Sequence, residues 1–246
     1  LKQAGVTKSE LTGIAYTQGP GLLGSLLVGT SFAKSMAMGL NIPLIDVNHM
    51  QGHILAHFIQ KKERHKPIPN FPFICLTVSG GHTQIVLVKD YLSMELIGET
   101  IDDAAGEAFD KAAKLLGLSY PGGPLLDQLS KEGDAEKFTF TFPKVGEFNY
   151  SFSGLKTQFL YFLQKEEKLN HNFIQENLND ICASYQQHIV NYLFIKLKKA
   201  VAKYNVKDVA IAGGVSANSC LRKTLAEIGQ KEGWNTFIPE FEYCTD

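Results

Sequence analysis

Cysteine is scarce in this sequence, with four residues in 246, and no two of them form a C-x-x-C pair. Cys75, Cys182, Cys220 and Cys244 lie far apart along the chain. This distribution matches neither a zinc ribbon nor a redox dithiol. We therefore expect reduced thiols in a cytoplasmic protein.

The sequence also lacks an excess of charge and a long apolar run. Lys and Arg number 24 against 25 Asp and Glu, which removes the bulk charge of a dedicated nucleic-acid binder but leaves room for local basic patches. The most apolar stretch, residues 21–40, is interrupted by hydroxyl side chains and one lysine, so we expect no transmembrane helix and no membrane association. Because the chain starts at Leu1 and stops at Asp246 without a tapering tail, we expect a fragment truncated at both ends.

The first 60 residues have the pattern of a layered α/β unit. Residues 12–17 and 44–47 are short apolar runs typical of buried strands. Between them, apolar and small residues recur at helical spacing and predict one core-facing helix. The residues of that predicted face are Leu22, Leu26, Gly29, Ala33, Met36 and Leu40. A second helix is predicted from residue 48 to about residue 60, so the order is strand, helix, strand, helix.

A polar segment at residues 61–66, followed by Pro67 and Pro69, is the best candidate boundary between two lobes. We therefore divide the chain into residues 1–68 and 69–246. In the second part, residues 71–78 and 84–88 predict a hairpin, residues 102–116 and 173–204 predict helices, and residues 208–212 predict a buried strand that turns into a helix.

His49 and His53 are four residues apart on a predicted helix, so their imidazoles project from one face and can share a divalent metal. Two incidental histidines are an equally good interpretation of this spacing alone. In the zinc metalloprotease motif the residue after the first His is a Glu that activates water, whereas here it is Met50. Peptide hydrolysis by that mechanism is therefore not expected.

Two glycine-rich segments are candidates for binding an anionic ligand. Residues 79–83 (SGGHT) follow a predicted strand, and residues 213–218 (GGVSAN) join a strand to a helix; exposed backbone N–H groups at such positions can hold phosphate oxygens. Neither segment matches the dinucleotide fingerprint or a P-loop. Asp110, on the helix at residues 102–116, can bind a hydroxyl or a metal-bound water, or pair with Lys114.

Seven ordered motifs together resemble the TsaD family, the tRNA N6-adenosine threonylcarbamoyltransferases, in its bacterial form. These are HMQGH at 49–53, VSGGHT at 78–83, DDAAGEAFDKAAKLLG at 102–117, YPGGP at 120–124, FSGLKT at 152–157, AGGVSAN at 212–218 and CTD at 244–246. The resemblance covers nearly the whole chain. It implies an α/β fold of the actin, sugar-kinase and Hsp70 (ASKHA) type, with two lobes, a nucleotide cleft and, in this chain, an incomplete first lobe.

The resemblance also implies a function: transfer of threonylcarbamoyl from threonylcarbamoyl-adenylate to N6 of the adenosine 3′ of the anticodon, in tRNAs that read codons starting with A. By resemblance, one divalent metal, iron or zinc, binds His49, His53 and Asp246. The adenylate, or ATP, binds Thr77, Val78, Ser79, Gly80, Gly81, Asp110, Gly123, Asp127 and Asn218. No catalytic side chain is assigned. The implied partners are tRNA, a paralogous subunit of the same fold and a small P-loop ATPase.

Two other functions are compatible with the same fold. One is a small-molecule kinase or carbamoyltransferase that modifies a hydroxyl group without tRNA. The other is a catalytically silent paralogue that serves as a scaffold, although such a protein would not need His49, His53 and Asp246 together.

Overall fold

The computed structural model describes residues 1–61 and 65–244. The chain divides into two compact units, Leu1–Leu55 and Ala56–Asp246, here called unit 1 and unit 2.

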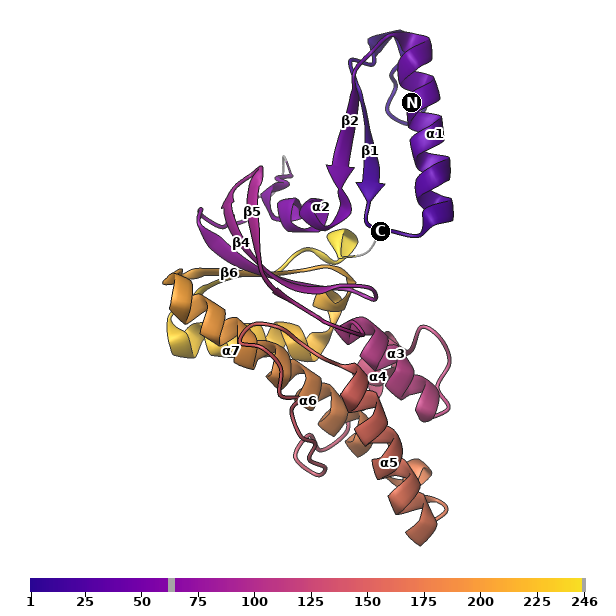
Figure 1. The fold of residues 1–246 in the computed structure, drawn as a ribbon, viewed down its shortest axis with the longest axis vertical. Helices are drawn as coiled ribbons and strands as arrows, with labels where there is room; N and C mark the ends of the chain where they lie inside the picture. The colour runs from indigo at the N-terminus through magenta and orange to yellow at the C-terminus, as the bar shows by residue number, and fades with distance from the viewer. Residues whose placement is uncertain (62–64, 245–246) are drawn as a thin grey trace. The chain divides into compact units, whose positions relative to one another are not determined.

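Unit 1 consists of two parallel strands, one long helix between them and a short helix after them (Figure 1). β1 (Ile14–Gly19) pairs with β2 (Leu44–Asn48), and the helices are α1 (Leu23–Leu40) and α2 (His49–Leu55); a 3-10 helix, η1 (Lys8–Glu10), precedes β1. This is the predicted order of strand, helix, strand and helix. α1 ends because Asn41 adopts a left-handed conformation, with φ 51° and ψ 47°, that is typical of helix C-termini.

The buried face of α1 is narrower than the sequence predicts. Ala33 and Ala37 are buried, and Leu26, Met36 and Leu40 are half-buried. Leu22, which was predicted to face the core, is 81% exposed. The reason is its position: Leu22 is the residue before the first helical residue, in an extended conformation, so the helical period does not apply to it.

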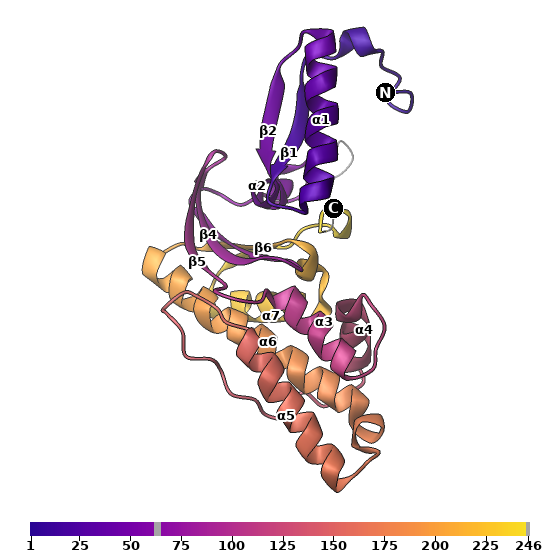
Figure 2. The same cartoon turned by 45° about the vertical axis from the view of Figure 1, so that its right-hand side comes forward.

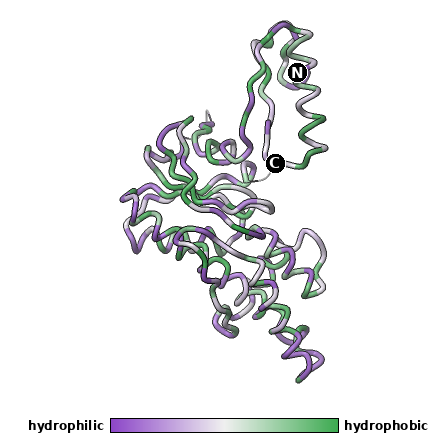
Figure 3. The backbone as a smooth tube through the Cα atoms, viewed as in Figure 1, coloured by the Kyte–Doolittle hydropathy of each residue, from purple (hydrophilic) through white to green (hydrophobic). Residues whose placement is uncertain are grey.

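Unit 2 is built on a mixed five-stranded sheet with the order β5-β4-β3-β6-β7. The strands are β3 (Phe73–Val78), β4 (Thr83–Asp90), β5 (Ser93–Glu99), β6 (Asp208–Ala212) and β7 (Asn235–Phe237). All residues of the central strands β3 and β6 are buried, which explains their unbroken apolar sequences. Green, hydrophobic segments run through the strands of this sheet in Figure 3. The predicted hairpin is the antiparallel β3–β4 pair.

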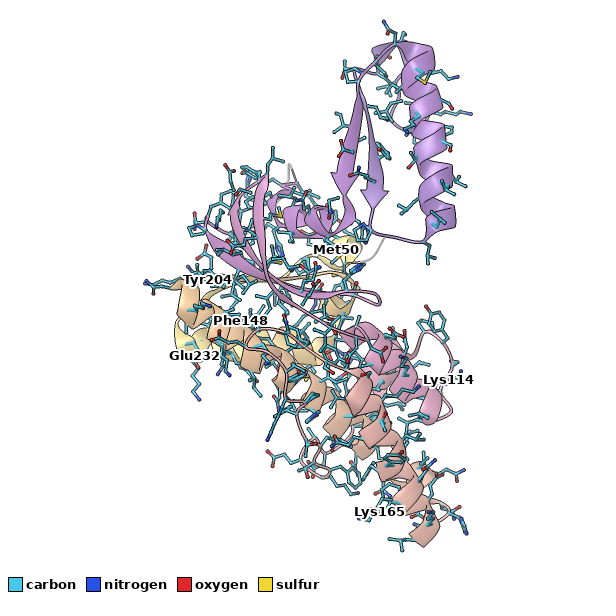
Figure 4. The ribbon with its side chains drawn as sticks, in the orientation of Figure 1. Met50, Lys114, Phe148, Lys165, Tyr204 and Glu232 are labelled. Carbon is cyan, nitrogen blue, oxygen red and sulfur yellow. The ribbon has the colours of Figure 1, made fainter. Side chains whose placement is uncertain are left out.

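The helices of unit 2 are stacked below the sheet in the views of Figures 1 and 2. They are α3 (Ala105–Leu115), α4 (Gly122–Ser130), α5 (Ser153–Leu169), α6 (Phe173–Tyr204) and α7 (Ser219–Glu232). Unit 2 also contains the 3-10 helices η2 (Ala56–Phe58), η3 (Gly214–Ala217) and η4 (Phe241–Tyr243). The C-terminal ends of α6 and α7 lie near each other (Figure 4), where Lys198 Nζ is 2.9 Å from a Glu232 carboxylate oxygen. One apolar core joins these helices to the sheet.

The boundary between the units lies between Leu55 and Ala56, not between residues 68 and 69 as the polar segment suggested. The segment that follows Leu55 belongs to unit 2 because its side chains pack there. His57 Nε2 lies 2.9 Å from the carbonyl oxygen of Ile211 on β6, and the Phe58 ring stacks on Phe71 with the ring centres 5.2 Å apart.

Asp102 does not belong to the helix on which it was placed. α3 begins at Ala105, and the Asp102 carboxylate instead accepts hydrogen bonds from Phe152 N at 2.7 Å and from the hydroxyls of Ser151 and Ser153. Burial opposes ionisation, but these donors outweigh it and hold the pKa of Asp102 below its usual value. Asp102 therefore anchors the start of α5, within the FSGLKT segment, to the loop before α3.

Candidate functional site

A pocket of about 410 Å³ lies within unit 2, where the loop after β3 meets α3, the start of α4 and η3. Five of the predicted adenylate-binding residues line it: Gly80, Asp110, Gly123, Asp127 and Asn218. Its other lining residues are Gly106, Phe109, Tyr120, Pro121, Pro124, Gly214, Val215 and Ala217. The structure thus brings together residues that are up to 138 positions apart, from Gly80 to Asn218 (218 − 80).

The sheet creates this pocket because β3 and β6 are parallel neighbours, with Thr77 opposite Ala212. The carboxyl ends of the two strands therefore lie at the same edge, where α/β sheets commonly bind ligands. Gly213 follows β6 with φ 84°, and a Cβ there would lie 2.5 Å from the carbonyl oxygen of Val78. Only glycine permits both the conformation and this close approach.

Gly106 allows the start of α3 to reach the same loop. A Cβ on Gly106 would lie 2.5 Å from the carbonyl oxygen of Ser79 and 2.8 Å from Gly80 Cα, and Gly106 N donates a hydrogen bond to Ser79 O at 3.2 Å. The N-terminus of an eleven-residue helix therefore lies next to Gly80. Its partial positive charge suits an anionic ligand group at this end of the pocket.

Asp110 binds the start of α4. Its Oδ1 accepts hydrogen bonds from Gly122 N at 2.9 Å and from Gly123 N at 3.1 Å. These N–H groups belong to the first turn of α4, whose amide groups have no partner within the helix. The carboxylate thus compensates the N-terminal end of α4. Lys114, its candidate partner from the sequence, lies near the far end of α3 (Figure 4).

Asp127 binds the start of α7 in the same way. Its Oδ1 accepts the Ser219 hydroxyl at 2.8 Å, and both carboxylate oxygens lie 3.2 Å from Ser219 N. Asn218 is the N-cap of α7, with its Oδ1 accepting Leu221 N at 2.9 Å. Asp110 and Asp127, two acidic side chains of the pocket, therefore each accept hydrogen bonds from backbone N–H groups at the N-terminus of another helix.

The remaining predicted adenylate residues lie near the pocket but do not line it. Thr77 and Val78 are fully buried in β3. Ser79 closes a tight turn, because its N donates to the carbonyl oxygen of His82 at 2.8 Å and its Oγ accepts His82 N at 3.1 Å. Gly81 is exposed in the same turn. A role for these four residues in binding stays a prediction.

The structure adds residues that the sequence does not single out. Tyr120 lines the pocket while 86% of its surface is exposed, so an aromatic ring stands at the rim. Gln186, on α6, is buried and contacts both Asp127 and Asn218. The YPGGP motif contains Tyr120, but the sequence gives its ring no role. Gln186 carries no motif and could be found only through its contacts.

The predicted metal ligands fall in different parts of the chain. His49 and His53 are both on α2, with ring centres 4.6 Å apart in an edge-to-face arrangement, and His53 is buried. Asp246 lies outside the described residues. Within residues 1–61 and 65–244, no group of three or more His, Cys, Asp or Glu side chains is arranged to hold a metal ion.

Among the helices of residues 1–61 and 65–244, none is long and apolar enough to cross a membrane.

Solved structures with low sequence identity share this fold. HypF from T. kodakarensis has a TM-score of 0.66 at 16% identity, over 95% of this chain and 38% of that one. Component A of the (R)-2-hydroxyglutaryl-CoA dehydratase of Acidaminococcus fermentans has a TM-score of 0.50 at 16% identity, over 96% of this chain and 72% of that one. These similarities confirm the predicted actin-like α/β fold class.

Sequence comparison gives the family. A family model described as TsaD, tRNA N6-adenosine threonylcarbamoyltransferase, matches residues 1–246. Proteins of that name from Christiangramia forsetii and Riemerella anatipestifer are 60% and 58% identical to the chain over 246 residues, which is 100% of this chain and 72% of each relative. The chain therefore belongs to the tRNA N6-adenosine threonylcarbamoyltransferases, a family of tRNA-modifying transferases.

Proposed function

We propose that the protein transfers a threonylcarbamoyl group from threonylcarbamoyl-adenylate to N6 of the adenosine 3′ of the anticodon, in tRNAs that read codons starting with A, and that the unit 2 pocket holds the adenylate. The observation that carries this proposal is the convergence of Gly80, Asp110, Gly123, Asp127 and Asn218 on one pocket. Family membership favours this reaction over a small-molecule kinase and over a silent scaffold.

The chemistry of the pocket suits a nucleotide. Four glycines in its wall leave room for a flat base and for close approach of backbone N–H groups: Gly80, Gly106, Gly123 and Gly214. In the described residues, Asp110 uses Oδ1 for its hydrogen bonds to the protein, so its Oδ2 can accept a hydrogen bond from a ribose hydroxyl. The N-terminus of α3, beside Gly80, suits the phosphate.

In the proposed reaction, the N6 amine of the tRNA adenosine attacks the carbamoyl carbonyl carbon. A C–N bond forms, the bond from that carbon to the phosphate oxygen breaks, and AMP leaves with the bonding electrons while N6 loses one proton. Backbone N–H groups that stabilise the phosphate make AMP a better leaving group. The protein's main contribution in this pocket is to bind and orient the adenylate.

The test uses the full-length protein with the enzymes that supply the adenylate, radiolabelled threonine, bicarbonate and ATP. Label should appear in a tRNA that reads a codon starting with A, and not in a tRNA that reads other codons. Label in neither tRNA, with the intermediate shown to be present, would refute the assignment. Label on a small hydroxyl compound in the absence of tRNA would favour the alternative enzyme class.

We also propose that His49 and His53, with Asp246, bind one divalent ion, iron or zinc. The structure supports two of these ligands, because the imidazoles are adjacent on one helix and neutral imidazole is a good ligand for either metal. Such an ion would act as a Lewis acid on the carbamoyl carbonyl. Elemental analysis of the full-length protein should show lower metal content in His53→Ala than in wild type, with His171→Ala as a control from an exposed loop. Equal metal content in all three proteins would show that His53 is not a metal ligand and would contradict the proposed site.

The partner proposal follows from α1. Val28, Phe32 and Met38, on one side of this helix, are 68% to 82% exposed, and large exposed apolar side chains often mark a protein interface. We propose a paralogous subunit of the same fold as the occupant of this face. A small P-loop ATPase as a further partner and a cytoplasmic location remain proposals that rest on the family resemblance.

A further inference from the structure

Gln186 lies between two residues of the proposed adenylate pocket. Its Nε2 donates hydrogen bonds to Asp127 Oδ1 at 3.1 Å and to Ser130 Oγ at 2.7 Å, and its Oε1 accepts from Asn218 Nδ2 at 2.7 Å. The side chain is 3% exposed. A single buried amide of α6 therefore joins α4, which carries Asp127, to Asn218, the N-cap of α7.

The direction of each hydrogen bond is fixed by a backbone group. Leu221 N can only donate, so the Asn218 atom that lies 2.9 Å from it is the oxygen Oδ1. Asn218 Nδ2 must then face Gln186, and Gln186 must present its oxygen to Asn218. Its amide nitrogen consequently faces Asp127, where a carboxylate needs a donor. No other orientation of the two amides satisfies all of these contacts.

Gln186 does not line the pocket that Asp127 and Asn218 line. It belongs to the layer behind them, so it cannot contact a ligand held in that pocket. Its effect on binding must act through the positions of Asp127 and Asn218. A side chain with this geometry is a positioning residue, because well-held partners fix the rotamers of residues that contact a ligand.

We infer that Gln186 is a positioning residue for adenylate binding: it holds the Asp127 carboxylate and the Asn218 amide in the orientations that the nucleotide requires. This inference rests on the proposed function of the pocket. It adds a residue of α6 to those that determine the geometry of the site. It also makes adenylate binding depend on a neutral hydrogen-bond donor beside Asp127.

The sharpest test is Gln186→Glu in the full-length protein, with AMP as the probe. At pH 8 the new carboxylate lies beside Asp127 Oδ1 and cannot donate a hydrogen bond, so the two like charges repel. At pH 5 the pair shares a proton and the donor returns, because coupled carboxylates have one raised pKa. We expect AMP binding about tenfold weaker than wild type at pH 8, since an interaction of one pK unit corresponds to tenfold, and within about threefold of wild type at pH 5.

Gln187→Glu is the matched control. It introduces the same charge one position further along α6, but Gln187 Nε2 donates to Asn191 and its Oε1 accepts from Cys220, away from the pocket. Its AMP affinity relative to wild type should be unchanged at both pH values. Gln186→Met, which keeps the length of the side chain but has no amide, should bind AMP about tenfold more weakly at both pH values, because each hydrogen bond to a charged group contributes a factor of this order.

Isothermal titration calorimetry gives these affinities, and thermal unfolding at each pH shows that the variants are folded. Recovery of Gln186→Glu at pH 5, without recovery of Gln186→Met, supports the inference. Wild-type affinity in Gln186→Met, or a loss in Gln186→Glu that does not change with pH, overturns it while leaving the pocket intact. Failure of the wild type to bind AMP at either pH overturns the proposed pocket as well.

Discussion

Asp110 and Gly123 are joined directly: Gly123 N donates a hydrogen bond to Asp110 Oδ1 at 3.1 Å. Both residues were predicted to bind the adenylate, and both line the pocket. The contact gives this carboxylate a structural role at the start of α4, and the proposed function gives its other oxygen a second role, in binding the ligand. These two roles can be separated by substitution.

Asp110→Asn keeps an oxygen that can accept from Gly122 and Gly123 N, whereas Asp110→Ala removes it. We expect Asp110→Ala to lower the free energy of unfolding by about 1 to 2 kcal/mol, as loss of a helix cap does. Asp110→Asn should unfold near the wild-type midpoint and yet bind AMP more weakly, because it loses the charge. Denaturant titration and calorimetry measure the two effects. Wild-type AMP affinity in Asp110→Asn would limit this carboxylate to its structural role.

Gly106→Ala should disturb the pocket, since the added Cβ would lie 2.5 Å from the carbonyl oxygen of Ser79. We expect a lower melting temperature and weaker AMP binding, because the loop that carries Gly80 must move. Gly154→Ala is the matched control: Gly154 is also the second residue of its helix, and no atom of the described residues lies within 4 Å of its Cβ position. Similar effects of the two substitutions would contradict this explanation.

Two buried histidines make stability depend on pH. Burial, opposed by a hydrogen bond to the Thr141 backbone, lowers the pKa of His188 to about 4, and burial lowers the pKa of His57 to about 4 as well. An unfolded histidine titrates near pH 6.5. Each buried histidine therefore makes its full contribution to the free energy of unfolding above pH 6.5, and this contribution is lost as the pH falls toward 4. The expected loss is about 3 kcal/mol per histidine.

His188→Phe should remove one of these two contributions. The His188 ring stacks on Phe142 with the ring centres 4.4 Å apart, and a phenyl ring can keep this stacking without taking up a proton. Urea unfolding between pH 4.5 and 7 should therefore show that the free energy of unfolding changes less steeply with pH in the variant than in wild type. An identical slope in both proteins would mean that His188 titrates normally in the folded state.

Gly29→Leu tests the proposed partner face of α1. No described atom lies within 4 Å of the Gly29 Cβ position, so unit 1 should fold with the larger side chain, whose bulk would obstruct a helix packed closely against α1. His171→Leu is the control, because it adds the same side chain at an exposed position outside α1. Size-exclusion chromatography with the paralogous subunit should show weaker association for Gly29→Leu only. Full association of a folded Gly29→Leu would place the interface elsewhere.

The sequence predicts the strands and helices whose apolar pattern is local. β6, at Asp208–Ala212, and α6, at Phe173–Tyr204, have the predicted bounds. The glycines and prolines of residues 120–124 favour a loop by local propensity, yet α4 already begins at Gly122. A helix forms there because Asp110 accepts the first amide groups, and this tertiary contact overrides the weak local propensity. β5 was missed because it is an edge strand with only partial burial.

The same distinction applies to the site. Asp110, Asp127 and Asn218 stand within sequence motifs, and the fold brings them together as the family resemblance implies. Gln186 is 59 positions from Asp127 and 32 from Asn218, inside a long helix whose pattern shows only that it is buried. No local signal distinguishes such a residue from its neighbours, so only the folded structure reveals it.

Photolabelling tests the central claim, that the pocket of unit 2 holds the adenylate. The full-length protein is irradiated with 8-azido-AMP, with and without excess AMP, and the labelled peptides are identified by mass spectrometry. Label that AMP suppresses should fall on the segments that line the pocket, around Tyr120 and around Val215. AMP-suppressible label confined to unit 1, or to parts of unit 2 away from these segments, would contradict the account.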